Sequence, residues 1–450
     1  MTNRNHRAGI ARQAARATTM ALGLLLAVSC SGVLDVPNPQ AFGSADLNNK
    51  IILKNVADGA EGLLHQAYDD YIVVTELLSD EMESTSTWID WEDISEGRLR
   101  HDWPSNGSFS GPQDQLLRAR FAAQSAKARV EEVLGPAASA SPLRAQVMMA
   151  DAIADLLLGM GWCESPLLSN APRSPDSDQF KQAITKFTAA IAAAQAITGD
   201  EPAKAKWTNV GYAGRARANL MAGNFAAAKA DAQLVPAGFQ YDAIYAEGAP
   251  STQSTTGNQF NQNRNRSGGL RRLYHARVHV IDSTGTGEAY LRDWYNATQD
   301  DKRMAVTRKA GQLGVNNRFA YFGVTKYASR ASAIRMFSKV EATLIEAEVA
   351  MRTGDFATEA ALLNGLRTRA GVALGAIAVP LSAAEAQKAV VNERMAELWV
   401  EGHRTQDLFR FNLVGSILGT GRAQKLPLSR TEILNNGVMK DGGGSCPNIS

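Results

Sequence analysis

The histidines of this chain are the first residues whose spacing could support metal chemistry. His275 and His279 are four residues apart, a spacing that places two metal ligands on one face of a helix. They lie in YHARVHVI (residues 274–281), where apolar and polar side chains alternate as they do in a strand. Four strand residues span about 13 Å, which is too far for both rings to bind one zinc ion at about 2 Å. We therefore expect no metal site.

Nucleophilic and acid–base catalysis find equally little support. NGSFSG (106–111) lacks the spacing of a nucleophile elbow, and the chain contains neither a P-loop nor a dinucleotide-binding glycine motif. Acidic pairs such as Asp80-Glu81 and Asp300-Asp301 could serve a glycosidase, which needs two carboxylates at a set separation. Such pairs are common on protein surfaces, however. We expect a protein that is not an enzyme and needs no cofactor.

The tryptophans suggest binding instead. The chain has only seven, and several lie in polar, loop-like stretches. An aromatic face gives the C–H face of a sugar ring an apolar platform, while neighbouring polar groups bond its hydroxyls. RDWYNATQDD (292–301) combines both kinds of group. The expected ligand-binding residues are Trp88, Trp91, Trp294, Tyr295 and Asn296; the alternative is that these rings only fix long loops to the core.

The N-terminus has the features of an export signal. The first 29 residues contain four arginines and no acidic residue, and the apolar run Met20–Val28 is too short to span a bilayer. AVSC (27–30) is similar to a bacterial lipobox, in which the cysteine carries lipid. We expect a signal peptide over residues 1–29 and a membrane anchor on Cys30. The alternative is an ordinary signal peptide that contains a cysteine.

The charge of the mature chain argues against nucleic acid as a partner. The whole chain has 47 Lys and Arg against 45 Asp and Glu. Removal of the four leader arginines (47 − 4 = 43) leaves a net charge of 43 − 45 = −2. Phosphate binding requires clustered positive charge, and the one basic run, NRNRSGGLRR (263–272), lies in a polar stretch typical of a solvated loop.

Two cysteines remain if Cys30 carries lipid. Cys163 and Cys446 form an even pair in a chain expected to enter an oxidising compartment. A disulfide between them would tie the C-terminal tail to the body of the protein, and the sequence leaves open whether they pair.

Helical periodicity prevails in the mature chain, residues 30–450, which we interpret as one domain. The segments with an amphipathic pattern rich in Ala, Leu and Met are 115–134, 144–160, 178–197, 205–222, 335–353, 356–370 and 382–400. Two loop-rich insertions, at about 80–112 and 236–332, interrupt them. The predicted fold is therefore mainly all-α with a few short strands, and binding is expected on the insertions.

Two helical segments are copies of one unit. ARANLMAGNFAAAKADAQ (216–233) aligns with AEVAMRTGDFATEAALLN (347–364). In each, a glycine suited to a helix C-terminus is followed by Asn or Asp, Phe and Ala, and then by a second helix. The pattern is similar to the helix hairpin of tetratricopeptide repeats, so we expect a scaffold of stacked helix pairs.

The segment NERMAELWVEGHRTQDLFRF (392–411) carries the most specific resemblance. It resembles the C-terminal signature of the SusD/RagB family, E-R-x-x-E-L-x-x-E-G-x-R-x-x-D-L-x-R. The block 337–372, the segment LPLSRTEILNN (426–436), LDVPNP (34–39) and ELLSDE (76–81) also resemble family features. Because arginines are interleaved with the glutamates of the signature, we expect ion pairs that hold the scaffold together rather than catalysis.

The resemblance implies a function as well as a fold. Family members are outer-membrane lipoproteins on the cell surface that form the lid of a SusC-like TonB-dependent transporter. They capture nutrient oligomers, usually glycans and in some members peptides, and pass them to that barrel. We expect the same of this chain. The alternative is a repeat-based lipoprotein scaffold that binds only protein partners.

Overall fold

A computed structural model describes residues 49–84, 89–100, 107–246, 276–277, 301–304, 306–313, 320–324, 326–327, 329, 331–439 and 446. Apart from Asn49, these residues belong to one compact unit, Lys50–Ser450. Its described part is mainly helical, which confirms the predicted fold class. No helix among the described residues is both long and apolar enough to cross a membrane.

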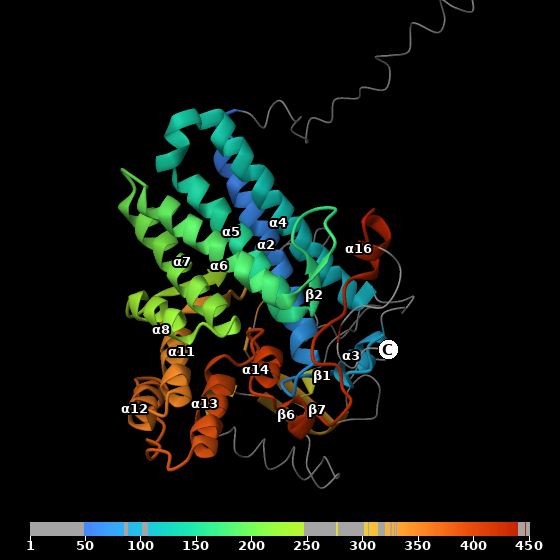
Figure 1. Cartoon of the computed structure of the whole chain (residues 1–450). Helices are drawn as coiled ribbons and strands as arrows, with labels where there is room; N and C mark the ends of the chain where they lie inside the picture. The colour runs from blue at the N-terminus through green and yellow to red at the C-terminus, as the bar shows by residue number, and fades with distance from the viewer. Residues whose placement is uncertain are drawn as a thin grey trace, which may run out of the picture. The chain divides into compact units, whose positions relative to one another are not determined.

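Consecutive helices pack on one another through the first half of the unit (Figure 1). Several begin at residues that cap the free backbone N–H groups of the first turn: Ser141 accepts from the N–H of Leu143 and Asp200 from that of Ala203. The helices are α2 (Leu53–Leu77), α4 (Gly107–Leu134), α5 (Pro142–Gly161), α6 (Asp176–Gln195), α7 (Glu201–Met221) and α8 (Phe225–Leu234). A 3-10 turn, η2 (Gly135–Ala140), joins α4 to α5.

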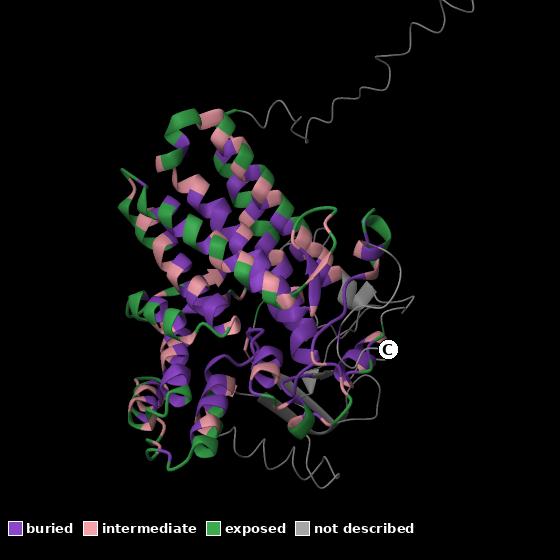
Figure 2. Ribbon diagram, in the orientation of Figure 1, coloured by how far each residue is buried: buried purple, intermediate pink, exposed green. Residues whose placement is uncertain are grey.

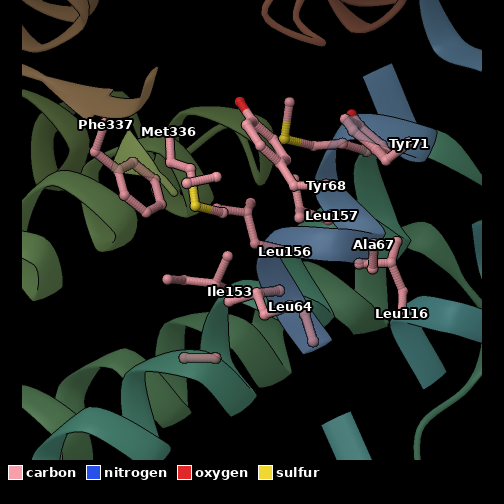
Figure 3. Close-up of a cluster of buried hydrophobic side chains, with 14 of the residues drawn as sticks. Leu64, Ala67, Tyr68, Tyr71, Leu116, Ile153, Leu156, Leu157, Met336 and Phe337 are labelled. Atoms are coloured by element: carbon pink, nitrogen blue, oxygen red, sulfur yellow. The ribbon is translucent and has the colours of Figure 1, made fainter. Parts of the chain in front are cut away.

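The main core lies between these helices. Buried positions follow the inward faces, while exposed positions mark the outer faces of the same helices (Figure 2). α5 is buried along most of its length. Aliphatic side chains of α5 meet Tyr68 and Tyr71 of α2 and Phe337 in one apolar cluster (Figure 3). α2 and α5 therefore form the centre of this main core.

The two predicted copies are helix hairpins. The first is α7–α8, and the second is α11 (Lys339–Arg352) with α12 (Phe356–Arg367). Gly223 and Gly354 connect the helices with φ of 78° and 77°, the left-handed conformation expected of a helix C-terminus. α11 packs against α8, so the hairpins are neighbours in the stack. α13 (Ala383–Glu397) lies against α11 and α12.

Two predicted helix starts are wrong. α4 begins at Gly107, before the predicted start at 115 and inside the insertion predicted at about 80–112. The segment 335–353 was expected to be helical throughout, but residues Ile334–Ser338 form strand β8 and α11 starts at Lys339. Ser338 marks the boundary, because its hydroxyl accepts a hydrogen bond from the N–H of Glu341. β8 pairs antiparallel with β4 (Gln240–Ala243).

The described parts of the predicted insertions contain short strands and helices. β1 (Glu83–Ser84) pairs with β5 (Ala276–Arg277), so the two insertions meet in one ladder.

Two further antiparallel pairs are β2 (Glu164–Pro166) with β3 (Arg173–Pro175) and β6 (Val306–Leu313) with β7 (Ala320–Val324). The remaining short helices are α3 (Ile89–Ser95), η3 (Lys302–Met304), α14 (Arg404–Arg410), α15 (Val414–Ile417) and α16 (Arg430–Asn435).

Candidate functional site

Only one predicted ligand-binding residue lies among the described residues. Trp91 was expected in a loop, but it lies in α3, is 6% exposed and belongs to the main core. The loop assignment is therefore wrong for Trp91, and its ring packs against other side chains. The other predicted ligand-binding residues, Trp88, Trp294, Tyr295 and Asn296, lie outside the described residues, as does Cys30.

The two remaining cysteines lie together. A disulfide joins Cys163 to Cys446 across a sequence separation of 283 residues, with the Cα atoms 5.6 Å apart. The backbone N–H of Cys163 also donates to the carbonyl of Leu426 at 3.1 Å. The C-terminal segment is thus held to the end of α5 by a covalent bond and by backbone pairing.

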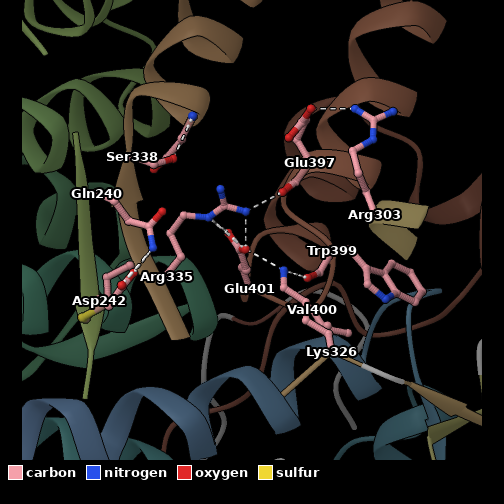
Figure 4. A network of polar contacts seen from close by, with 12 residues as sticks. Gln240, Asp242, Arg303, Lys326, Arg335, Ser338, Glu397, Trp399, Val400 and Glu401 are labelled. Atoms are coloured by element: carbon pink, nitrogen blue, oxygen red, sulfur yellow. Dashed lines mark hydrogen bonds and ion pairs between the residues drawn. The ribbon is translucent and has the colours of Figure 1, made fainter. Parts of the chain in front are cut away.

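The three glutamates of the signature are each engaged by basic side chains. Figure 4 shows two of them, Glu397 and Glu401, with their partners. Arg367 donates to Glu393 at 3.0 Å. Glu397 accepts from Arg303 at 2.6 Å and from Arg369 at 2.7 Å. Arg335 and Lys326 reach Glu401 at 2.7 and 2.6 Å, and these cations hold the pKa of Glu401 below its usual value although burial acts to raise it.

The arginines of the same segment bind acids of other elements. Arg404 makes a bidentate pair with Asp80, which follows α2, at 2.6 and 2.7 Å. Arg394 donates to Asp407 at 2.7 Å. All four side chains are at most 5% exposed. Removal of one partner would leave a buried charge unpaired, which costs about 3–5 kcal/mol, so this segment fastens α13 and α14 to α2.

The turn between α13 and α14 is held directly by α2. Val400 and Gly402 have φ of 47° and 78°, and Tyr71 donates to the carbonyl of Gly402 at 3.0 Å. A Cβ on Gly402 would lie 2.6 Å from the Tyr71 ring, so only glycine fits there. The N–H of Val400 donates to Glu81 at 2.7 Å. ELLSDE (76–81) and the signature are thus two sides of one contact.

Two buried carboxyl groups meet at this contact. Burial raises the pKa of Glu76 to about 7, and burial together with the nearby Glu76 carboxyl raises the pKa of Glu81 well above its usual value. The two groups are close enough for each to act on the pKa of the other, and two carboxyl groups can form a hydrogen bond with each other only through a proton. The Ser79 hydroxyl donates to Glu76 at 3.1 Å. This acid pair is a structural, proton-binding contact.

The described residues offer little for catalysis. Within the ranges that the structure describes, no group of three His, Cys, Asp or Glu side chains could hold a metal ion. The acids of the signature are bound to cations, and His403 is buried among arginines with its pKa well below the usual value, because burial disfavours the charged ring.

The sequence did not reveal three partners of the signature glutamates, Lys326, Arg303 and Arg335, because they lie 62–94 residues away from them.

Comparison with known proteins relates this chain to one protein family. Residues 240–443 match the family model of the SusD family. A search among curated proteins found no match. The match contains the signature and the second hairpin, and it confirms the predicted SusD/RagB relationship.

Solved structures share the fold over most of the chain. A SusD-like carbohydrate-binding protein from Bacteroides vulgatus ATCC 8482 is 15% identical, with 80% of this chain and 83% of that chain covered at a TM-score of 0.60. A laminarin-binding SusD-like protein is 15% identical, with 84% and 97% covered at 0.61. A SusD superfamily protein from Bacteroides thetaiotaomicron VPI-5482 is 15% identical, with 87% and 97% covered at 0.62.

Proposed function

We propose that this SusD-like protein binds nutrient oligomers, most readily a glycan, and delivers them to a SusC-like TonB-dependent transporter of the outer membrane. The observation that carries the proposal is the SusD family match over residues 240–443, joined to a SusD-like fold. Two of the similar structures are described as carbohydrate-binding and laminarin-binding proteins. The engagement of the signature acids by cations supports binding without catalysis.

The proposed location is the outer membrane, with lipid on Cys30 and the body of the protein at the cell surface. The lipobox-like AVSC supports it. The disulfide between Cys163 and Cys446 supports export, because structural disulfides persist in oxidising compartments and are rare in the cytosol. A scaffold of packed helices suits a lid that moves as a rigid body over a transporter.

The ligand-binding residues that we propose are Trp88, Trp294, Tyr295 and Asn296. Calorimetric titration of the chain from Ser31 onward with glycans and peptides tests them. We expect one glycan class to bind, Trp88→Ala and Trp294→Ala to weaken binding, and Trp88→Phe to retain it because the aromatic platform remains. Unchanged affinity in both alanine variants would reject these residues. Binding of peptides alone would reject the glycan.

The transporter partner needs a separate measurement. Purification of the lipid-anchored protein from outer membranes should co-purify a large β-barrel protein, whereas a Cys30→Ala variant without the anchor should recover less of it. Recovery of the protein as a monomer, with no barrel in either case, would refute the delivery role.

A further inference from the structure

The helical scaffold carries a hollow that uses none of the residues proposed above. It has a volume of about 480 Å³ and lies where α16 packs against α4, with Leu63 of α2 at its side. Its walls include Asp114, Arg118 and Phe121 of α4, and Glu432 and Asn435 of α16. A volume of this size is within the range of about 300–1,000 Å³ that small-ligand sites occupy.

An exposed aromatic ring forms one wall. Phe121 is 60% exposed, although Ala119 and Ala123 on the opposite face of α4 are fully buried. Phe121 follows Arg118 by three residues and Asp114 by seven, so the three side chains share one face of the helix. Exposure of a phenyl ring to water is unfavourable, so a ligand that covers the ring gains binding free energy.

The polar side chains around the ring have unused bonding capacity. Among the described residues, Arg118 makes no hydrogen bond, although its charge acts on the nearby Asp114 carboxyl, whereas Arg120 on the other face of α4 pairs with Asp155. Asn435 also makes no side-chain hydrogen bond to any described residue. Both side chains are therefore donors that remain available to a ligand in the hollow.

The two carboxylates of the hollow are fixed in place. Asp114 accepts from the Ser429 hydroxyl at 2.7 Å. Glu432 accepts from the Asn436 amide at 2.8 Å. A carboxylate has about four acceptor positions, so each retains capacity for a further donor. The lining therefore combines oriented acceptors, free donors and an aromatic face.

We propose that this hollow binds a pyranose unit of a neutral oligosaccharide, stacked on Phe121 and hydrogen-bonded by Arg118, Asn435 and the two carboxylates. A sugar ring has both an apolar C–H face and hydroxyls that donate and accept. Charge favours a neutral sugar, because two carboxylates face one guanidinium and an acidic sugar would be repelled. The inference rests on the proposed function only in taking a glycan as the ligand; the residues are different.

The test compares Phe121→Ala with Leu168→Ala, which removes a side chain of similar exposure, 59%, elsewhere on the surface. Laminarin, starch and mannan serve as neutral probes and polygalacturonate as the acidic one. We expect Phe121→Ala to weaken binding of a neutral glycan about three- to tenfold, Phe121→Trp to restore it, and Leu168→Ala to leave it unchanged. Because Phe121 is exposed, the alanine variant should keep its circular dichroism spectrum.

Hydrogen exchange of the wild-type protein with and without glycan separates this proposal from the preceding one. Slower exchange in peptides of α4 and α16, lost in Phe121→Ala, supports the hollow. Protection confined to the insertions, with unchanged affinity in Phe121→Ala, overturns the hollow and leaves the proposed function standing. Binding that is lost in Phe121→Ala but kept in Trp88→Ala and Trp294→Ala supports the hollow and rejects the other residues. No binding of any neutral glycan overturns the hollow; binding of polygalacturonate or of a peptide in the same titrations would leave the proposed function standing.

Discussion

Glu359 gives the sharpest prediction about stability. It lies in α12 at the position that corresponds to Ala228 in the first hairpin, and it is fully buried. Neither carboxylate oxygen has a hydrogen-bond partner among the residues the structure describes. Burial raises its pKa from 4.5 to about 7. We expect Glu359→Met, which keeps the length of the side chain and removes its charge, to stabilise the protein at neutral and alkaline pH.

The magnitude follows from the pKa shift. A rise from 4.5 to about 7 is worth about 3 kcal/mol at most, and water that reaches the group would reduce it. Because the folded pKa is raised, the folded state binds the proton more tightly than the unfolded state. The contribution is therefore fully present below about pH 4.5 and is lost as pH rises to about 7. The gain from Glu359→Met should be largest near pH 8 and smaller by about 1–3 kcal/mol near pH 4.5.

Urea unfolding of wild type, Glu359→Met and Glu359→Gln across this pH range measures the effect. Both variants should lose the pH-dependent part, since neither residue ionises. Glu359→Met should also be more stable than Glu359→Gln at every pH, because a buried amide without a partner costs about 1–3 kcal/mol. A difference between wild type and Glu359→Met that stays constant with pH would refute the reasoning, because it would mean that the carboxyl is not buried alone.

Three further predictions concern the contacts of the scaffold. Gly402→Ala should lower the free energy of unfolding in urea by about 2–4 kcal/mol, because alanine disfavours the left-handed backbone and its Cβ would overlap the Tyr71 ring. Gly199→Ala is the control: φ is also positive there, at 76°, but the space around the residue is open, so the cost should be only about 1 kcal/mol. Cys163→Ser should lower stability by about 2–5 kcal/mol in the same assay, and an equal midpoint under oxidising conditions would contradict this. Glu76→Gln supplies an N–H in place of the shared proton, so the variant should lose less stability than wild type as pH rises from about 4.5 to about 7; a parallel pH profile would rule out the shared proton.

The helices could be predicted because their apolar positions repeat over many turns, as in 144–160 and 178–197. The boundary at Ser338 was missed because Phe337 fits the helical spacing of Leu344 and Met351, although it lies in a strand. The spacing Ser338-x-x-Glu341 is itself a helix-start signal. The helix starts at this signal, although the apolar periodicity extends further towards the N-terminus. The residues before it form strand β8 because they gain backbone hydrogen bonds with β4.

The candidate sites were harder to predict. The short helix around Trp91 has no recognisable helical periodicity, because most of its residues are polar. Only Trp91 and Ile94 of this helix contribute apolar side chains to the core. The partners of the signature glutamates come from distant segments, and charge alone does not say which arginine meets which acid. The α4–α16 hollow depends on the approach of residues that are more than 300 positions apart, such as Phe121 and Asn435. No local pattern in the sequence encodes such an encounter.

The β4–β8 ladder has a consequence for how such proteins diversify. Ala243 pairs with Ile334 and Gln240 with Ser338, so the two ends of the intervening segment lie side by side in one ladder. Lengthening a segment whose ends are already fixed costs little entropy, about 0.6 kcal/mol for each doubling. Changes of length between Ala243 and Ile334 can therefore be accommodated without a shift of the helix stack. Arg303 and Lys326 must be kept, because they bind the buried glutamates of the signature.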